Sequence, residues 1–278
     1  MFSTRKNPLF SDPIEPVSGL TISDLNRYLP AVHKIEDISM TAESMQTGLF
    51  LGLGLQGLQK LPDKSIDLII ADPPETPLVT AMQNKSPMKL QEYYKWNDLW
   101  IKESQRILKN TGAIFLMTGW RYSGMYQALL SNYFRVQTRI TWRDRTTQGQ
   151  TGSKTWFNQL SDIWFATKTG DFYYNKKNDN KVAEDSQSIF FTEIESSNLW
   201  SDILDIQTGS KPQLEGDKPE QLISRILETS SLKLNWVVDP FMRCGGVGVV
   251  AKRLGRRFIG FEALQDRLLM AMKRIDHD

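Results

Sequence analysis

The chain has 278 residues, of which 40% are hydrophobic and 24% charged, and its formal net charge is +2. These proportions are typical of a globular protein with a buried core, and they exclude a fibrous or largely disordered chain. One cysteine and two histidines cannot build a disulfide framework or a Cys/His zinc site, so we expect no metal. No apolar run reaches the length of a signal peptide or a membrane span, and we expect a soluble cytoplasmic protein.

From about residue 65 onward, short apolar runs alternate with longer stretches of helical periodicity. This alternation predicts an α/β fold in which helices cover both faces of a mostly parallel, doubly wound sheet. The predicted strands are Ser65–Asp72, Ala113–Thr118, Phe134–Arg143, Ser161–Lys168, Asn235–Phe241 and Arg257–Glu262. The predicted helices are Glu92–Lys109, Arg121–Leu130, Lys218–Ser230, Gly246–Leu254 and Ala263–Ile275.

Two parts of the chain show no clear periodicity. Residues 1–45 form an N-terminal segment that the pattern does not assign, and residues 46–278 are predicted to form one domain. Residues 170–212 mix polar residues with isolated aromatics, which predicts an irregular insertion in that domain. The stretch 121–154 is locally basic, a property of surfaces that meet phosphate backbones and also of ordinary solvated surfaces.

Two predicted strands end in an acidic residue followed by a tight turn. The first reads Asp72-Pro73-Pro74-Glu75, and the second reads Asp239-Pro240-Phe241 and leads into Gly245-Gly246 and a helix. The next strand ends in Glu262, where a carboxylate can accept hydrogen bonds from ribose hydroxyls while the glycines let a ligand approach the backbone. This layout indicates a nucleoside-containing cofactor at the carboxyl edge of the sheet, although a plain strand-to-helix turn has the same pattern.

Two weaker signals point elsewhere. Gly52-Leu53-Gly54-Leu55-Gln56-Gly57 matches the dinucleotide fingerprint, but Leu61-Pro62 ends any helix there too early for that fold. Cys244 is not predicted to be a nucleophile, because His33 and His277 lie near the chain ends and no base is evident.

Four segments, in chain order, resemble motifs of the DNA amino-methyltransferases. The strand ending in Asp72-Pro73-Pro74 resembles their catalytic motif, and residues 158–168 resemble a strand that follows it. Lys218-Pro219-Glu220-Gln221-Leu222 resembles the helix before the cofactor motif, which Val237–Phe241 and Gly255–Glu262 resemble. The order of these motifs is that of the circularly permuted beta group, and the resemblance covers roughly residues 48–275. It implies a Rossmann-like methyltransferase fold, S-adenosylmethionine as cofactor and double-stranded DNA as partner.

The resemblance also implies the role of each matching residue. The Asp72 carboxylate and the Pro73 carbonyl would accept hydrogen bonds from the exocyclic amine of a flipped base, so that its nitrogen can attack the methyl group. Target recognition would lie in residues 144–212. The implied catalytic residues are Asp72, Pro73, Pro74 and Glu75, the cofactor contacts are Lys218, Pro219, Asp239, Phe241, Gly245 and Glu262, and the DNA contacts are Arg143, Arg145, Lys154 and Asn158.

The sequence departs from the family pattern in three motifs. Glu75 replaces the aromatic residue that stacks on the flipped base, and Leu53 replaces an acidic residue. Either Glu75 contacts the base by hydrogen bonding, or another aromatic residue such as Trp120 or Tyr94 takes the stacking role. Arg243-Cys244 stands where the family has Gly-Ser, and Arg243 is bulkier than glycine at a close approach unless its side chain turns outward.

The functional hypothesis is a site-specific DNA methyltransferase of a prokaryotic or phage restriction-modification system, acting on adenine N6 in preference to cytosine N4. The family's Asp form of the catalytic motif favours adenine. The alternative is a catalytically degenerate relative that binds DNA or an active partner subunit, and a homodimer or a partner methyltransferase subunit is compatible with either hypothesis.

Overall fold

The computed structural model describes residues 19–74, 88–143, 159–175, 197–203 and 218–278. Its strands are β1 (His33–Lys34), β2 (Gly48–Leu51), β3 (Ile66–Ala71), β4 (Leu108–Gly119), β5 (Arg135–Arg143), β6 (Leu160–Thr167), β7 (Leu199–Trp200), β8 (Trp236–Asp239) and β9 (Arg257–Glu262). Its helices are α1 (Ile22–Tyr28), α2 (Gly54–Lys60), α4 (Leu90–Ile107), α5 (Trp120–Tyr133), α6 (Glu220–Ser230), α7 (Gly246–Arg253) and α8 (Gln265–His277), with short 3₁₀ turns at Leu29–Ala31 and Ile35–Asp37. No helix in these ranges is long and apolar enough to cross a membrane.

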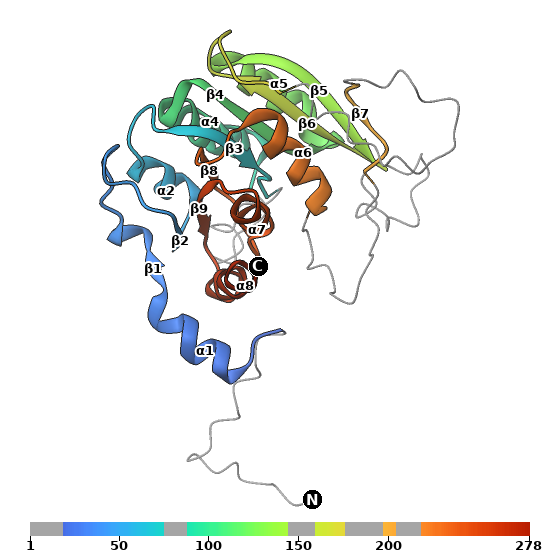
Figure 1. The fold of residues 1–278 in the computed structure, drawn as a ribbon. Helices are drawn as coiled ribbons and strands as arrows, with labels where there is room; N and C mark the ends of the chain where they lie inside the picture. The colour runs from blue at the N-terminus through green and yellow to red at the C-terminus, as the bar shows by residue number, and fades with distance from the viewer. Residues whose placement is uncertain (1–18, 75–87, 144–158, 176–196, 204–217) are drawn as a thin grey trace, which may run out of the picture.

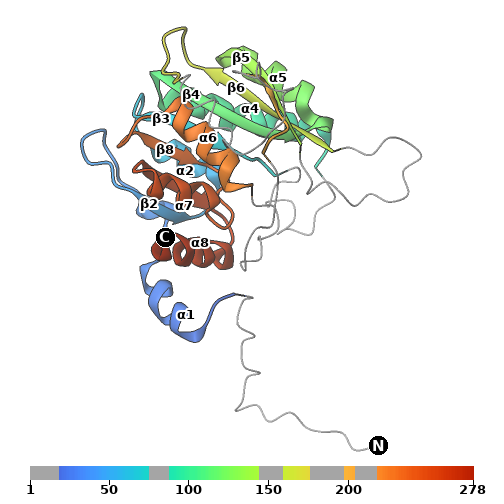
Figure 2. The same ribbon diagram turned by 45° about the vertical axis from the view of Figure 1, so that its right-hand side comes forward.

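All the described strands belong to one sheet, in the order β1-β2-β9-β8-β3-β4-β6-β5-β7. Only β6 runs antiparallel to its neighbours, β4 and β5, and the other pairings are parallel. Helices cover both faces, with α2, α4 and α5 on one and α6, α7 and α8 on the other (Figures 1 and 2). The predicted doubly wound, mostly parallel α/β fold is therefore confirmed.

The central strands are apolar because they are covered on both faces. In β3, Leu68 and Ile70 face one core cluster with α6 and α7, while Ile69 faces the other with α4 and α5. All three side chains are buried. A strand with two buried faces shows a continuous apolar run instead of an alternating pattern, and β3 has such a run in the sequence.

The direction of winding reverses between β3 and β8. From β3 the chain passes through α4 to β4 on one side, and from β8 it passes through α7 to β9 on the other side. The two strands are parallel neighbours, with Leu68 opposite Val237 and Ile69 opposite Val238. At such a switch point the connecting helices diverge onto opposite faces and leave a crevice at the carboxyl edge, where ligands bind in open α/β sheets.

The glycines of the apparent dinucleotide fingerprint have a packing role. A Cβ atom added at Gly54 would lie 2.1 Å from the Pro240 carbonyl oxygen, and one at Gly57 would lie 2.4 Å from the Phe261 ring. Helix α2 has seven residues and ends before Leu61. Its glycines therefore bring a short helix close to β8 and β9, and the predicted early end of the helix is confirmed.

Several element boundaries differ from the sequence-based prediction, and strand β7 was not predicted. Helix α4 ends at Ile107 and not at Lys109, because Leu108 already pairs with Ile66 and the residues after it form an irregularity in β4. Within the segment expected to be irregular, Trp200 is buried and pairs in β7 with Trp142 of β5. The pairing of a two-residue strand depends on a distant partner and leaves no local periodicity.

The described N-terminal residues pack onto the main body. Helix α1 lies against α8, where the Tyr28 hydroxyl donates to Asp276 at 2.9 Å and Lys273 donates to Asp24 at 2.8 Å. Of the expected recognition segment 144–212, strand β6 is an inner strand of the sheet, between β4 and β5. The predicted recognition role of the rest remains a prediction, since residues 144–158, 176–196 and 204–217 lie outside the described residues.

Candidate active site

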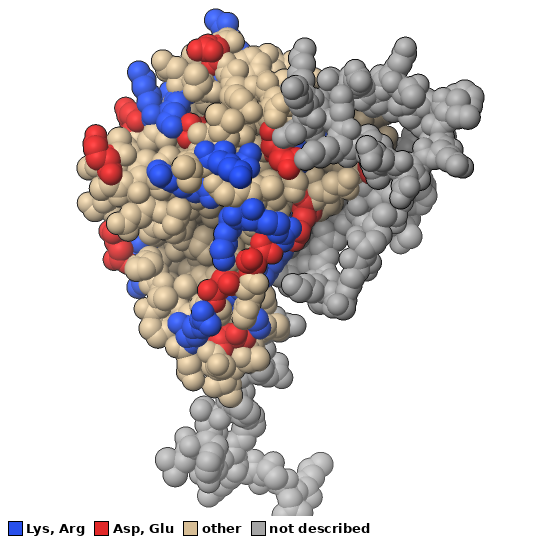
Figure 3. Space-filling model, viewed as in Figure 1, with Lys and Arg blue, Asp and Glu red and all other residues tan. Residues whose placement is uncertain are grey.

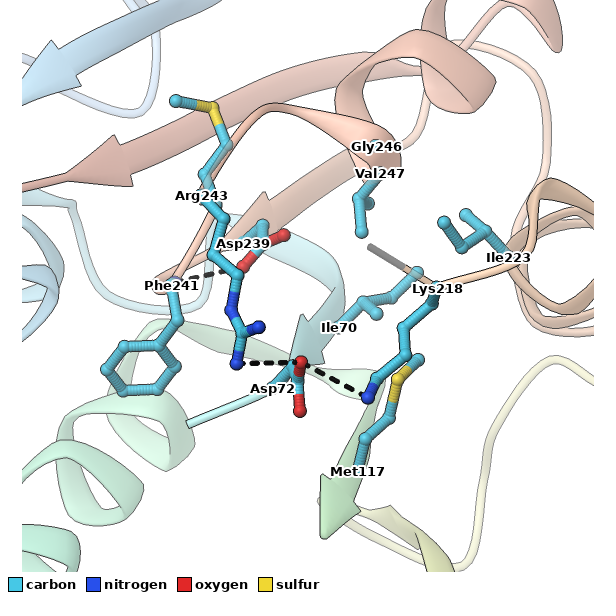
Figure 4. Close-up of a pocket in the computed structure, with 11 residues that line it drawn as sticks. Ile70, Asp72, Met117, Lys218, Ile223, Asp239, Phe241, Arg243, Gly246 and Val247 are labelled. Atoms are coloured by element: carbon cyan, nitrogen blue, oxygen red, sulfur yellow. Dashed lines mark hydrogen bonds and ion pairs between the residues drawn. The ribbon is translucent and has the colours of Figure 1, made fainter. Parts of the chain in front are cut away.

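A pocket opens at the carboxyl edge of the sheet where β3 and β8 meet (Figure 4). Side chains from both strand ends, from the turn after β8 and from the start of α6 line it. Met117 near the end of β4 closes one side. The lining residues are Ile70, Asp72, Met117, Lys218, Ile223, Asp239, Phe241, Met242, Arg243, Gly246 and Val247.

The Asp72 carboxylate lies between two cations in this pocket. Arg243 Nη2 is 3.2 Å from Asp72 Oδ2, and Lys218 Nζ is 3.5 Å from the same oxygen. Figure 4 shows Lys218 reaching it from before α6 and Arg243 from the turn after β8. The Asp72 side chain is 21% exposed, so the carboxylate is accessible to a ligand and held by opposite charges.

Asp239, at the end of β8, is in a different environment. Its side chain is buried, and its Oδ1 accepts a hydrogen bond from the Phe241 backbone N–H at 2.9 Å. Burial raises the pKa of Asp239 to about 8, and the neighbouring charges of Asp72 and Glu262 add to this rise. At neutral pH this carboxyl is therefore protonated for most of the time in the free protein.

Phe241 lines the pocket and also anchors the turn. Its ring lies 5.2 Å from that of Trp100 in an edge-on arrangement and 5.7 Å from that of Trp96, measured between ring centroids. Such aromatic pairs add about 0.5–1.5 kcal/mol beyond the area they bury. The cluster fixes the turn after β8 against α4, the helix that comes after the catalytic candidate Asp72.

The Asp72-Pro73-Pro74 turn is held by a buried tyrosine. The Tyr93 hydroxyl of α4 donates to the Pro74 carbonyl at 3.0 Å and lies 2.9 Å from the Tyr126 hydroxyl of α5. Tyr126 in turn donates to the side-chain oxygen of Asn97 at 2.9 Å. Because the buried hydroxyls and the amide are hydrogen-bonded, this network stabilises one conformation of the turn.

Glu262 and Gly245 lie next to the pocket without lining it. The Glu262 side chain is buried at the end of β9, and burial raises its pKa against the lowering effect of the Leu264 N–H that it binds at 2.8 Å. Gly245 begins α7 with φ +81°, and a Cβ there would lie 2.8 Å from the Ala271 Cβ. The left-handed backbone favours glycine at this position, and the close contact leaves no room for a Cβ atom.

The other predicted site residues have different positions. Pro219 caps α6 beside Lys218, and Arg143 is exposed at the carboxyl end of β5. Glu75, Arg145, Lys154 and Asn158 lie outside the described residues.

The prediction from sequence missed several pocket residues. Met117, Ile223 and Val247 supply apolar walls, but each belongs to an ordinary apolar stretch that is not distinctive in the sequence. Tyr93 is different, because it belongs to a helical series with Trp96, Asn97 and Trp100. An asparagine among aromatic residues on a buried helix face is a detectable signal of a polar network.

Two exposed aromatic residues are candidates for the stacking role that Glu75 leaves open. Trp120 comes directly after the carboxyl end of β4 and is 65% exposed, whereas Tyr94 on α4 is 37% exposed. Among the described residues on the face viewed in Figure 3, lysines and arginines are interspersed with acidic residues.

The described part of the chain contains no cluster of residues that could hold a metal ion, and the site is made of carboxylates, cations, an aromatic ring and a glycine turn.

Residues 66–273 match the family model described as DNA methylase. The match covers most of the chain, and the protein belongs to this DNA methylase family.

Relatives of known type extend this result. The chain is 28% identical over 243 residues to the type II methyltransferase M2.DpnII of Streptococcus pneumoniae, which covers 79% of this chain and 85% of that protein. Its fold is similar to that of the cytosine-N4-specific PvuII DNA methyltransferase, with a TM-score of 0.64, 17% identity and coverage of 82% and 87%. It is also similar to M1.HpyAVI in complex with S-adenosylmethionine, with a TM-score of 0.60, 20% identity and coverage of 84% and 100%.

Proposed function

We propose that this protein transfers a methyl group from S-adenosylmethionine to the exocyclic amine of a base in double-stranded DNA, at a specific sequence. The observation that carries the proposal is the pocket itself, in which Asp72 and Asp239 come from two neighbouring parallel strands at a topological switch point. The family match supports DNA as the substrate, and a relative of the same fold binds this cofactor.

The residues around the pocket fit a cofactor of this chemistry. Glu262 would supply a buried acceptor for ribose hydroxyls, and Asp239 contributes a buried carboxyl group to the pocket wall. Gly246 leaves room for a ligand at the backbone, while Val247 and Ile223 give apolar contact. When bound, S-adenosylmethionine supplies an electrophilic methyl group on a positively charged sulfur.

Asp72 and Pro73 would prepare the nucleophile. The lone pair of an exocyclic amine is delocalised into the base ring, so the amine attacks poorly on its own. The Asp72 carboxylate and the Pro73 carbonyl would accept its two N–H bonds and localise the lone pair on nitrogen. Tyr93 supports this geometry, because it anchors the carbonyl of the adjacent Pro74.

We further propose adenine N6 as the preferred target, on the Asp form of the catalytic turn. The base would be flipped out of the duplex to reach the pocket, which costs a few kcal/mol. Exposed Trp120, at the end of the strand next to β3, is the candidate to stack on the flipped base in the place of an aromatic at position 75. Arg143 and the predicted residues Arg145, Lys154 and Asn158 are the candidates to contact DNA, together with segment 144–212.

The test is transfer of labelled methyl from S-adenosylmethionine to unmethylated genomic DNA, followed by digestion of the product to nucleosides. We expect label in N6-methyladenine, and a loss of at least about 10³-fold in rate for Asp72→Ala. Asp171→Asn is the matched control, because Asp171 is exposed beyond the opposite end of the sheet and should leave the rate unchanged.

The alternative is a degenerate relative without activity, and the cations on Asp72 give it a specific basis. It predicts no label in DNA with the parent protein and no binding of the cofactor in calorimetry. Label in N4-methylcytosine would instead support the methyltransferase activity and show that the target base is cytosine and not adenine.

A further inference from the structure

Arg243 has a backbone conformation that disfavours its own residue type. Its φ is +51°, and among the described non-glycine residues only Lys64 and Leu234 also have a positive φ. A side chain in this region costs on the order of 1 kcal/mol relative to glycine. Glycine would satisfy the turn, so the arginine is not explained by the fold.

The side chain turns into the pocket, not outward. Its guanidinium crosses from the turn after β8 to Asp72 on β3, at 3.2 Å, and is 30% exposed (Figure 4). Lys218 approaches the same carboxylate oxygen from the other side at 3.5 Å. The Arg243 backbone N–H is engaged separately with Glu262, whose pKa it lowers. The main chain of the turn is thus held by Glu262, the proposed ribose contact, while the guanidinium points toward Asp72, the proposed catalytic residue.

The charges at this point do not balance. Arg243 and Lys218 carry two positive charges, and Asp72 carries one negative charge between them. Asp239 and Glu262, whose charges also interact with that of Arg243, are both buried and offer no exposed counter-charge. Two cations that converge on one carboxylate at the lip of a pocket can accept a second carboxylate, because oppositely charged groups within about 4 Å favour each other.

S-adenosylmethionine brings one such group, the α-carboxylate of its amino-acid moiety. We propose that Arg243 binds this carboxylate, and that its guanidinium leaves Asp72 when the contact forms. The inference rests on the proposed function and deepens it. Cofactor binding would thereby remove one of the two cations from Asp72, so that its carboxylate is freer to accept the target amine in the loaded protein.

The test compares two ligands that differ by the carboxylate alone. S-adenosylhomocysteine carries it, whereas S-adenosyl-3-thiopropylamine is the decarboxylated form and keeps the adenosine, the thioether and the ammonium group. Affinities are measured by calorimetry with the full chain and with Arg243→Gly. We expect the substitution to weaken S-adenosylhomocysteine about tenfold, the effect of one charged hydrogen bond. The decarboxylated ligand should change less than about twofold.

Two controls separate this effect from a change in the fold. Lys64→Gly also replaces a residue of positive φ, at 50° and before β3, and should leave both affinities unchanged. Arg243→Gly should unfold at the parent temperature or above it, because glycine suits the turn.

Three outcomes of the ligand comparison would overturn the inference. If Arg243→Gly weakens the binding of both ligands equally, Arg243 has a structural role in the pocket. If both ligands bind more tightly, its side chain obstructs the pocket, and if neither affinity changes, Arg243 stays paired with Asp72. Failure of the parent protein to bind either ligand is a separate result, since it refutes the proposed function on which the inference depends.

Discussion

The turns after β3 and β8 begin with the same dipeptide, Asp-Pro, and lie side by side, yet their carboxylates are in opposite environments. Asp72 is partly exposed and lies between two cations. Asp239 is buried, binds the backbone N–H of Phe241, and has a pKa raised to about 8. An identical local sequence therefore gives an accessible anion in one turn and a mostly neutral structural group in the other.

The difference arises from the residues that pack against each turn. After β8, Phe241 packs on Trp96 and Trp100 and covers its own strand end. After β3, the chain is held from behind by Tyr93, and the carboxylate stays at the surface of the pocket. Substitutions in and around the two turns test what each environment contributes to stability and activity. Among them, the substitution at Asp239 is expected to change the free energy of unfolding most.

Asp239→Asn should stabilise the protein at neutral pH. Asp239 has a pKa of about 8 in the folded chain and an ordinary value near 3.8 in the unfolded chain. Between these values the unfolded chain loses the proton first, so this residue makes stability fall as pH rises from about 4 to 8. Its upper bound is about 4 kcal/mol at pH 7. We expect a gain of about 2 kcal/mol, because the new amide N–H₂ must find acceptors.

Denaturant unfolding at pH 5 and pH 8 measures this gain, which should be larger at pH 8. Asp171→Asn, at an exposed position, should show no such pH-dependent gain. A stability curve for Asp239→Asn parallel to that of the parent between the two pH values would contradict the assignment of a protonated Asp239.

Phe241→Leu should lower the free energy of unfolding by about 1.5 kcal/mol, since the ring contacts with Trp96 and Trp100 are lost. It should also weaken cofactor binding, because the ring lines the pocket. Phe165→Leu is the matched control, as Phe165 stacks on Phe115 in the other core cluster. The control should lose similar stability and keep its cofactor affinity. Equal losses of affinity in the two variants would contradict a direct role of Phe241 in cofactor binding.

Tyr93→Phe should have the smallest effect on stability, about 1 kcal/mol, because it removes one hydroxyl from the buried network. Its main effect should be on kcat, about tenfold, with little change in KM, because the Pro74 carbonyl loses its anchor. Tyr133→Phe, on α5, removes a hydrogen bond to Asp98 on α4 and should leave kcat unchanged. A higher KM with an unchanged kcat would contradict a role of Tyr93 in positioning Asp72.

The sequence predicted the sheet core well because its central strands are buried on both faces. β3, β8 and β9 each carry a short, nearly continuous apolar run with a carboxylate at its end or directly after it, and that combination marks both the strand and its functional end. The pairing of β3 with β8 results from the chain reversal and not from either strand alone. The order of the motifs along the chain therefore indicates the arrangement of the strands, which no single motif does.

The features that the sequence did not predict depend on contacts between distant residues. The turn at Arg243 has a positive φ, but no local pattern says that its side chain reaches Asp72 on another strand. The pairing of Trp200 with Trp142 joins a two-residue strand to the sheet edge, without a periodic signal of its own. The environment that distinguishes Asp239 from Asp72 is likewise made by α4, which comes after β3 and not after β8.

The antiparallel direction of β6 has a consequence for how such a protein can change. β5 ends at Arg143 and β6 begins at Leu160, and these two residues are paired at the same edge of the sheet as Asp72. A connection between two fixed neighbouring points can lengthen at a cost of only about 0.6 kcal/mol for each doubling. Insertions at this one junction can therefore diversify the surface beside the pocket while the strands that hold the reacting groups keep their register.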